Sequence, residues 1–332
     1  MSLAVLYGRL RPAGDRRCRV VTDLEEVVRL LRGNAGKYLI VINPMSRMGK
    51  GLRTALWVIA RLVLRRVDFE AVLTTRAGHA EKIVAEYEGS VDVVVALGGD
   101  GTIQEVVNGI MKRNQRPALA VFPAGRGNDF CYLMGFKKNK KKAFKAMLSR
   151  FEREVDLLKV NDRYASNVVG LGYDASVQEK AQHYKYFPVA HYIFAALYLI
   201  FKHPPKLQMH IEHANGEWDG EFLITVIGHT RKYARHIRMF PGLQVDGGVM
   251  KIAAFRPGST WFALLVLALA GVGLCTRVPQ CLKTETPWVE VTPGQTIKAQ
   301  ADGELFFVGQ DETLRIELVR SALRVKALTP AK

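Results

Sequence analysis

The stretch that decides the fold runs Val91-Asp-Val-Val-Val-Ala-Leu-Gly98-Gly99-Asp100-Gly101-Thr102. Its first seven residues include four valines and form a short apolar run, which is typical of a buried strand. The glycines that follow stop this strand, and apolar residues at helical spacing continue over residues 103–111. A strand, a glycine-rich turn and a helix in this order indicate an α/β fold.

The neighbouring segments repeat this alternation of strand and helix. Apolar runs predict strands at residues 38–42, 69–73 and 118–122, whereas helical spacing predicts helices from residue 50, at 79–87 and from residue 130. Such an alternation predicts a mostly parallel sheet that helices cover on both faces, with ligands at the carboxyl ends of the strands. We therefore expect an α/β domain over residues 36–153.

The sequence from residue 154 to 319 predicts a β-rich domain. Asn-Gly and Asp-Gly pairs, which favour antiparallel hairpins, recur at residues 215, 219, 246 and 302. Short strands are predicted at 155–160, 164–168, 207–212, 222–227, 249–255, 288–291, 296–299 and 314–318. Apolar helical segments at 192–201 and 261–274 are expected to be buried, with contact to a membrane as the alternative for the second of them.

The charge of the chain is strongly positive. It has 332 residues with 48 Lys and Arg against 31 Asp and Glu, a formal net charge of +17. Basic residues cluster at 137–145 and 231–238, and residues 1–35 form a further basic extension without an assigned role. Nucleic acid, an anionic membrane and phosphorylated small molecules are all compatible with this charge, as is a solvated surface.

The sequence also limits where the protein is expected to act. No apolar run reaches the length of a membrane-spanning helix, and the N-terminus lacks the pattern of a secretory signal. The four cysteines are scattered and form no metal-binding pair, which favours free thiols in a reducing compartment. We expect a soluble intracellular protein.

Two glycine-rich loops at the predicted strand ends are suited to phosphate, and a third loop is not a standard phosphate loop but offers Lys50 and Arg47 as point charges. After one strand, Gly98, Gly99 and Gly101 allow close approach of the backbone, the following helix adds positive potential, and Asp100 could hold Mg²⁺. A second glycine-rich loop, 123–130, follows the next strand. The first strand leads into residues 43–51, which lack the glycine and the Ser/Thr of a Walker A loop. Tight turns and helix caps are the simpler alternative for each loop.

Seven motifs together resemble the catalytic domain of the diacylglycerol kinase family, which includes bacterial soluble lipid kinases and is related to sphingosine and ceramide kinases. They extend in order from about residue 37 to 318. The motifs are Asn43-Pro44 with Gly49-Lys50-Gly51, Thr75-x-x-Gly78-His79-Ala80, Gly98-Gly99-Asp100-Gly101-Thr102, Pro123-x-Gly125-x-x-Asn128-Asp129-Phe130, Gly170-Leu-Gly172-Tyr-Asp174-Ala175, Asp246-Gly247-Gly248 and Asp302-Gly303-Glu304.

This resemblance implies a fold and an activity. The fold would be a Rossmann-like nucleotide-binding domain followed by an antiparallel β-sandwich domain, with the active site in the cleft between them. Residues 320–332 would return to the first domain. The activity would be ATP-dependent transfer of the γ-phosphoryl group to the hydroxyl of a lipid, with a diacylglycerol-like acceptor and Mg²⁺.

The same resemblance assigns roles to individual residues. Glu304 would be the catalytic base, Asp100 would act in catalysis and hold Mg²⁺ with Asp129, and Asp246 would belong to a further Mg²⁺ site. Nucleotide binding would fall to residues of the first domain, namely Asn43, Lys50, Thr75, Gly98, Gly99, Gly101, Thr102, Gly125, Arg126, Asn128 and Asp129.

Two departures from the family pattern leave alternatives open. Arg126 stands where relatives often have Thr or Ser, and residues 229–236 carry basic residues where a glycine run is usual. The alternatives are an enzyme similar to NAD kinase and a catalytically silent lipid- or nucleic-acid-binding protein. For the kinase we expect cytoplasmic protein that contacts the inner face of the membrane through basic patches, without nucleic acid and with a homodimer as an option.

Overall fold

A parallel sheet forms the centre of the first domain in the computed structural model, which describes residues 38–47, 49–183, 198, 201, 206–231 and 237–329. Strand β3 (Val93–Gly98) lies between β1 (Tyr38–Ile42) and β4 (Ala118–Pro123), and β2 (Phe69–Leu73) adds the outer edge. Every residue of β3 is buried, as its apolar sequence requires. The basic extension at 1–35 lies outside the described residues.

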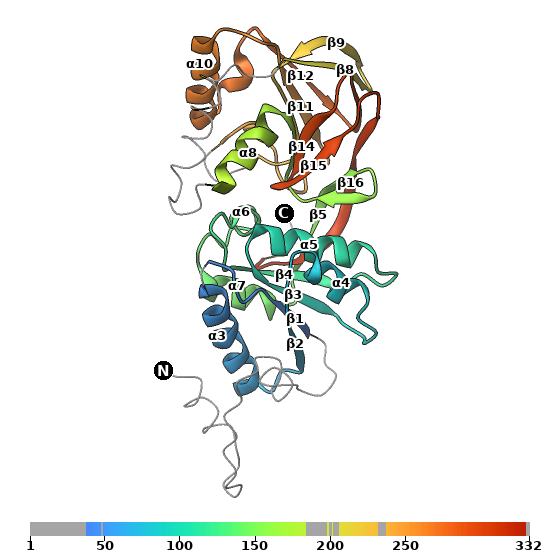
Figure 1. The fold of residues 1–332 in the computed structure, drawn as a ribbon. Coiled ribbons are helices and arrows are strands. Elements are labelled where there is room, and N and C mark those ends of the chain that lie inside the picture. The colour runs from blue at the N-terminus through green and yellow to red at the C-terminus, as the bar shows by residue number, and fades with distance from the viewer. Residues whose placement is uncertain are drawn as a thin grey trace, which may run out of the picture.

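Helices cover both faces of this sheet (Figure 1). Helix α3 (Lys50–Leu64) and α7 (Lys140–Met147) pack together through the rings of Trp57 and Phe144, whose centroids are 5.5 Å apart. Helix α4 (His79–Ala85) packs on α5 (Asp100–Met111), and the short α6 (Asp129–Leu133) follows β4.

The second domain is a β-sandwich. One of its sheets is antiparallel throughout, with six strands in the order β12-β11-β10-β7-β14-β15. These strands are β7 (Val168–Gly172), β10 (Ile224–Gly228), β11 (Met250–Phe255), β12 (Cys281–Thr286), β14 (Ile297–Ala301) and β15 (Glu304–Val308).

The facing layer belongs to the sheet that begins in the first domain. It contains β5 (Glu152–Val160), β6 (Arg163–Ala165), β8 (Leu207–His213), β9 (Gly216–Phe222), β13 (Trp288–Pro293) and β16 (Leu314–Lys326). An apolar core that includes Leu158, Ile211 and Ile316 of this layer and Leu171, Ile252 and Ala299 of the six-stranded sheet fills the sandwich. Helices α8 (Tyr173–His183) and α10 (Thr260–Val272) and the 3-10 helix η1 (Cys275–Arg277) complete the domain.

Strand β16 joins the two domains. Its first residues pair with β13, whereas Val325 near its end lies opposite Leu119 of β4. The register shifts between Val319 and Leu323, where Ser321 has a φ of 47°. The last residues of β16 thus extend the sheet of the first domain.

These elements confirm the predicted fold class, with several local differences. The strand expected at 164–168 is interrupted at Ser166 and Asn167, and Asp219-Gly220 lies inside β9 rather than in a turn. Strands β12 and β15 were not predicted. The helix expected at 192–201 lies outside the described residues, apart from Tyr198 and Phe201, which are exposed.

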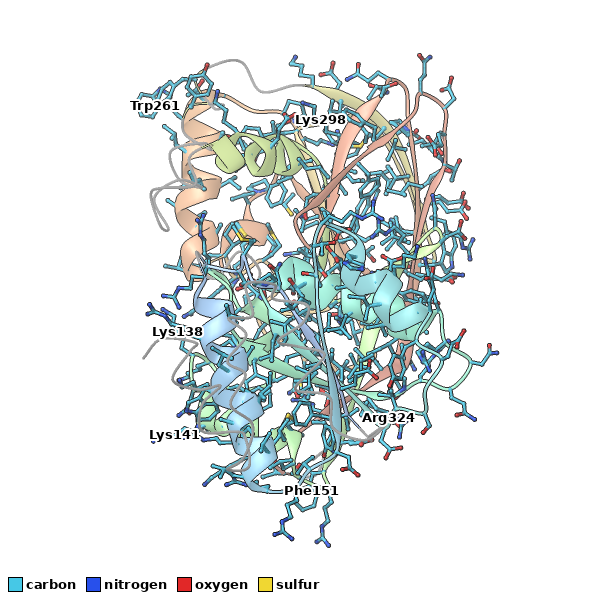
Figure 2. All side chains as sticks on the ribbon, turned by 60° about the horizontal axis from the view of Figure 1, so that its bottom comes forward. Lys138, Lys141, Phe151, Trp261, Lys298 and Arg324 are labelled. Carbon is cyan, nitrogen blue, oxygen red and sulfur yellow. The ribbon has the colours of Figure 1, made fainter. Side chains whose placement is uncertain are left out.

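The expectation that the apolar helix at 261–274 is buried is wrong. In α10 only Ala263 and Ala270 are buried, and Trp261 projects from its outer end (Figure 2). A helix that is apolar on all faces is usually buried on all of them. Helix α10 instead packs one face on the core of its domain and leaves the opposite face exposed to solvent. Among the residues that the structure describes, no helix has the length and apolar character needed to span a bilayer.

Candidate active site

The two glycine-rich loops after β3 and β4 touch each other. A Cβ atom on Gly125 would lie 2.5 Å from the Cα of Gly99, closer than two carbon atoms can approach. Gly99 also precedes the N-terminus of α5 in an extended conformation. The contact between the loops therefore depends on the absence of a side chain at Gly125, and it brings two backbone turns to one end of the sheet.

Asp100 lies at the point where these loops meet. Its Oδ2 accepts a hydrogen bond of 2.7 Å from the backbone N–H of Asn128, and its Oδ1 is buried without a hydrogen-bond partner among the described residues. A Cβ on Gly127 would lie 2.5 Å from Oδ2 of Asp100 and 3.7 Å from Oδ2 of Asp129. Both carboxylates therefore lie beside the Gly127 backbone.

The electrostatic state of Asp100 follows from its burial. Burial raises the pKa of this carboxyl, and the backbone amides at 128–130 oppose that change only in part. Asn128 has a left-handed backbone conformation and stabilises the turn through its side chain. Its side chain accepts from the Gly125 N–H at 2.7 Å and donates to the Gly125 carbonyl at 2.9 Å.

The loop that follows β1 forms hydrogen bonds with both glycine-rich loops. Asn43 donates from Nδ2 to the Thr102 hydroxyl at 3.0 Å, and Ser46 donates to the Ala124 carbonyl at 2.9 Å. A Cβ on Gly51 would lie 2.7 Å from the Asn43 carbonyl oxygen, which accounts for glycine where a Walker A loop has Ser or Thr. Lys50 is the first residue of α3.

Thr75 and Arg126 lie at the edges of this assembly. The backbone N–H of Thr75 donates to His79 Nδ1 at 3.1 Å, and its hydroxyl lies 3.0 Å from the same atom. This pair closes the turn before α4. Arg126 is exposed on the second glycine loop.

The second domain contributes the hairpin between β14 and β15. Asp302 is partly buried in its turn and accepts from the Ser166 backbone N–H, from the Ser166 hydroxyl at 2.7 Å and from the Val168 N–H at 3.0 Å. Burial raises the pKa of Asp302 to about 6, and the negative charge of Asp100 adds to this shift.

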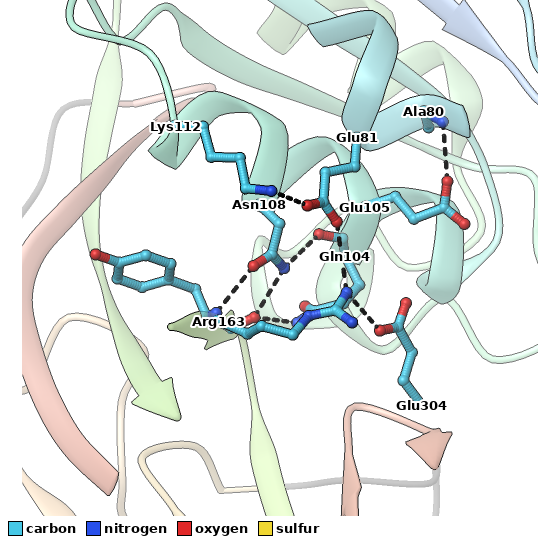
Figure 3. A network of polar contacts seen from close by, with 9 residues as sticks. Ala80, Glu81, Gln104, Glu105, Asn108, Lys112, Arg163 and Glu304 are labelled. Carbon is cyan, nitrogen blue, oxygen red and sulfur yellow. Dashed lines mark hydrogen bonds and ion pairs between the residues drawn. The ribbon is translucent and has the colours of Figure 1, made fainter. Parts of the chain in front are cut away.

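Glu304 begins β15 and faces helices α4 and α5 of the first domain (Figure 3). Its Oε2 lies 2.9 Å from Nη2 of Arg163, which is also 3.4 Å from a carboxylate oxygen of Glu81. Lys112 in turn contacts Glu81 at 2.6 Å. Burial raises the pKa of Glu304, with further increases from Glu105, Glu81 and Asp302, while the Arg163 charge lowers it.

Hydrogen bonds hold β6 against α5 next to this ion-pair chain. Asn108 donates to the Tyr164 carbonyl at 3.0 Å and accepts from the Tyr164 N–H at 2.9 Å, and Gln104 donates to the same carbonyl. Because Arg163 precedes Tyr164, these bonds fix the backbone that carries the arginine (Figure 3). The site is thus assembled from both domains.

Comparisons with known proteins agree with this arrangement. The family model of the diacylglycerol kinase catalytic domain matches residues 37–160, and that of the YegS C-terminal NAD kinase beta sandwich-like domain matches residues 167–326. Residues 37–160 therefore form a domain of the diacylglycerol kinase catalytic-domain family. The two matches meet between β5 and β7.

Relatives of the diacylglycerol kinase family cover most of the chain at modest identity. A diacylglycerol kinase of Staphylococcus saprophyticus is 27% identical over 272 residues, which are 80% of this chain and 88% of the relative. One of Staphylococcus aureus strain Newman is 28% identical over 275 residues, 80% and 85% of the two chains. The crystal structure of a diacylglycerol kinase from Bacillus anthracis superposes with a TM-score of 0.71 at 21% identity and covers 88% of this chain and 96% of its own, which shows the shared fold.

The diacylglycerol kinase motifs divide into those that the structure brings together and one that lies apart. Asn43 and Thr102 meet in a hydrogen bond, and the loops that contain Asp100 and Gly125 are in contact. Asp246 instead forms a two-point ion pair with Arg153, which lowers the pKa of the Asp246 carboxyl. Its assignment to a metal site stays a prediction. Within the described residues, no three His, Cys, Asp or Glu side chains gather as a metal cluster.

Mg²⁺ nevertheless fits the paired carboxylates of this kinase-family site. Mg²⁺ prefers oxygen ligands, is bound by one or two carboxylates and keeps several waters. Asp100 supplies an oxygen without a hydrogen-bond partner among the described residues, and the Asp129 carboxylate lies near the same side of Gly127.

Three residues with clear structural roles were not singled out from the sequence. Ser46, Asp302 and Arg163 join segments that are far apart in the chain. Ser46 lies within the loop at 43–51 and its partner Ala124 within a quoted motif, whereas the Ser166 and Val168 groups that bind Asp302 lie outside every quoted motif. Arg163 follows a turn and carries no pattern that would mark it.

Proposed function

We propose that this protein is an ATP-dependent lipid kinase that transfers the γ-phosphoryl group to the hydroxyl of a diacylglycerol-like acceptor. Membership of the family supports lipid-kinase-like activity in general terms. One observation carries the proposal: Glu304 of the second domain faces α4 and α5 of the first, and Arg163 pairs with both Glu304 and Glu81, which supports one site between the glycine-rich loop before α5 and Glu304.

The first domain would bind the nucleotide phosphates. The glycine loops expose backbone amides, and the N-terminus of α5 contributes positive potential next to them. Asn43 holds the Thr102 hydroxyl at the start of that helix, and Lys50 and Arg126 bring positive charge to neighbouring loops. Asp100 and Asp129 would hold Mg²⁺, which when bound neutralises charge on the phosphates.

Glu304 would act as the general base toward the acceptor hydroxyl. A base acts best when its pKa approaches the working pH, and the burial of Glu304 raises its pKa in that direction. Asp302 fixes the hairpin turn before it, and Arg163 holds the carboxylate in place. Both act as positioning residues.

The direct test presents several acceptors to the full chain. Labelled phosphate from ATP and Mg²⁺ would be followed into extractable lipid, with vesicles that contain diacylglycerol, a polyprenol, a sphingoid base or a glycerophospholipid. We expect label in one lipid class and loss of label in Glu304→Gln, with Glu290→Gln as the matched control on β13. ATP binding without label in any lipid would contradict the proposal.

A second candidate is phosphorylation of NAD. The Gly98–Thr102 sequence also occurs in NAD kinases, and the matched C-terminal model is described as NAD kinase beta sandwich-like. Including NAD among the acceptors separates the two activities in one assay. Transfer to NAD and to no lipid would replace the lipid kinase.

We further propose that the kinase works at the cytoplasmic face of a membrane, since its acceptor resides there. The net charge of +17 favours an anionic surface. No nucleic-acid substrate is proposed. A homodimer stays a prediction, which sedimentation of the purified chain would test.

A further inference from the structure

Helix α10 presents one apolar face to solvent. Trp261, Leu265 and Val272 are 80%, 51% and 62% exposed, and Ala268 between them is exposed too. These positions are four, three and four residues apart, so they form one stripe along the helix. We call this stripe the α10 face.

The opposite side anchors the helix in the second domain. Ala270, with the partly buried Val266 and Leu269, packs on a core cluster of that domain. The Ser259 side chain accepts from the Phe262 N–H at the start of the helix, and Gly273 ends it in a left-handed conformation. The α10 face therefore belongs to a well-formed helix with a fixed orientation.

The described sequence on either side of α10 is basic. Residues 237–284 contain five Lys and Arg and one acidic residue, Asp246, which Arg153 already pairs, while Glu285 follows directly and pairs with Lys251. Exposed Arg256 precedes the helix and exposed Arg277 follows it, while the Arg238 backbone donates to the Ala270 carbonyl at 3.0 Å. None of these three arginines has an ion-pair partner among the described residues.

An apolar stripe with a cationic rim matches one kind of surface in particular. An anionic bilayer offers an apolar interior for the stripe and negative headgroups for the rim. A second copy of this chain would bring the same positive charges to the same place, and they would repel. Thirteen residues are too few to cross a bilayer, so the helix would lie in its surface.

We propose that the α10 face is the surface by which this protein docks on anionic membranes. The inference deepens the proposed function, on which it rests for the lipid nature of the acceptor. Docking itself needs neither ATP nor acceptor. Vesicle binding and kinase activity can therefore fail separately.

The test measures binding of the full chain to vesicles of phosphatidylcholine with about 30% phosphatidylglycerol, and to phosphatidylcholine alone. Trp261→Ser/Leu265→Ser should lower the partition coefficient about tenfold or more, because two apolar side chains no longer enter the interface. Arg256→Gln/Arg277→Gln should lower it about tenfold at low salt. Leu64→Ser, at a site 81% exposed on α3, and Lys138→Gln/Lys141→Gln are the matched controls and should bind as the wild type does.

Tryptophan fluorescence supplies a second readout. Trp261 is the most exposed of the four tryptophans, so a blue shift on anionic vesicles should be lost in Trp261→Phe while binding is retained. Circular dichroism checks that each variant is folded.

Three results would overturn the proposal: wild-type protein that leaves anionic vesicles unbound, equal binding by the α10-face variant, or an equal loss in the Leu64 control. Conversion of a dimer to a monomer by Trp261→Ser/Leu265→Ser, without a change in vesicle binding, would make the face a contact between copies of the chain.

Discussion

The environment of Glu304 is set by residues outside its own motif. Arg163 lies 2.9 Å from its carboxylate and is itself shared with Glu81, so one guanidinium bridges the two domains. Asp302, two residues before Glu304, accepts hydrogen bonds from the backbone N–H groups of Ser166 and Val168 and so fixes the hairpin turn. The chemistry attributed to Glu304 therefore depends on contacts that only the folded chain provides.

Replacing Arg163 should change the pH dependence of the reaction. Since the Arg163 charge lowers the pKa of Glu304, Arg163→Ala should raise that pKa and move the acid limb of kcat/KM to higher pH. Because the arginine is exposed, solvent screens part of its charge, so the predicted result is the direction of the shift. The measurement is a pH profile of lipid phosphorylation.

Lys112→Ala is the control for Arg163, because its ammonium group contacts Glu81 and not Glu304. An unchanged acid limb in Arg163→Ala would contradict the role assigned to the ion pair.

Asp302 should give the free energy of unfolding a recognisable pH dependence. Its pKa is raised from 3.8 to about 6 in the folded state, so the folded protein holds a proton that the unfolded chain releases between these values. The stabilisation is therefore present below about pH 4 and is lost as the pH rises to about 6. Urea unfolding across this range should show a smaller decrease in Asp302→Asn, while the exposed Asp162→Asn should match the wild type. Equal slopes in Asp302→Asn and wild type would refute the assignment.

At the scale of elements, the sequence predicts the first domain well and the second less well. Continuous apolar runs mark β1, β3 and β4 because these strands are buried on both faces, whereas the edge strand β2 is only partly buried. The strand expected at 164–168 breaks at Ser166, where Asp302 from another hairpin binds the backbone. The apolar sequence of α10 predicted a buried helix. The prediction is wrong because a local pattern does not show which other elements of the fold cover a helix.

The contact between the glycine loops predicts a specific sensitivity. Gly125→Ala places a Cβ against the Gly99 backbone and should destabilise the protein by about 1–3 kcal/mol, since backbone cannot yield as a side chain can. Gly271→Ala has no neighbour within 4 Å and lies in α10, so it should stabilise by about 0.5–1 kcal/mol. Thermal unfolding measures both, and tolerance of Gly125→Ala would show that the loops do not touch.

At the scale of the whole molecule, β16 ties the domains into one sheet. The segment around Ser321, where β16 passes from the second domain to the first, is held by Asp156. This buried carboxylate accepts from the Ser321 N–H at 3.0 Å and from the Gly248 N–H at 2.7 Å. The site lies between domains that this strand and the Tyr164 hydrogen bonds hold together. Neither link was visible from local sequence pattern, because each joins residues more than fifty positions apart.

Asp156→Ala should therefore destabilise the whole protein. It leaves two amides unsatisfied, each at a cost of about 1–3 kcal/mol, and urea unfolding should show one transition at lower denaturant concentration. The exposed Asp162→Ala should leave the midpoint unchanged. A wild-type midpoint in Asp156→Ala would mean that this carboxylate does not support the crossing.

The central claim is that the two domains form a phosphoryl-transfer site in which Glu304 is the base. The most direct measurement compares ATP binding and phosphate transfer to lipid in the wild type, Glu304→Gln and Glu290→Gln. We predict that Glu304→Gln binds ATP as the wild type does and transfers phosphate about 10²–10⁴ times more slowly, while Glu290→Gln retains both properties. Transfer at the wild-type rate by Glu304→Gln would contradict the account.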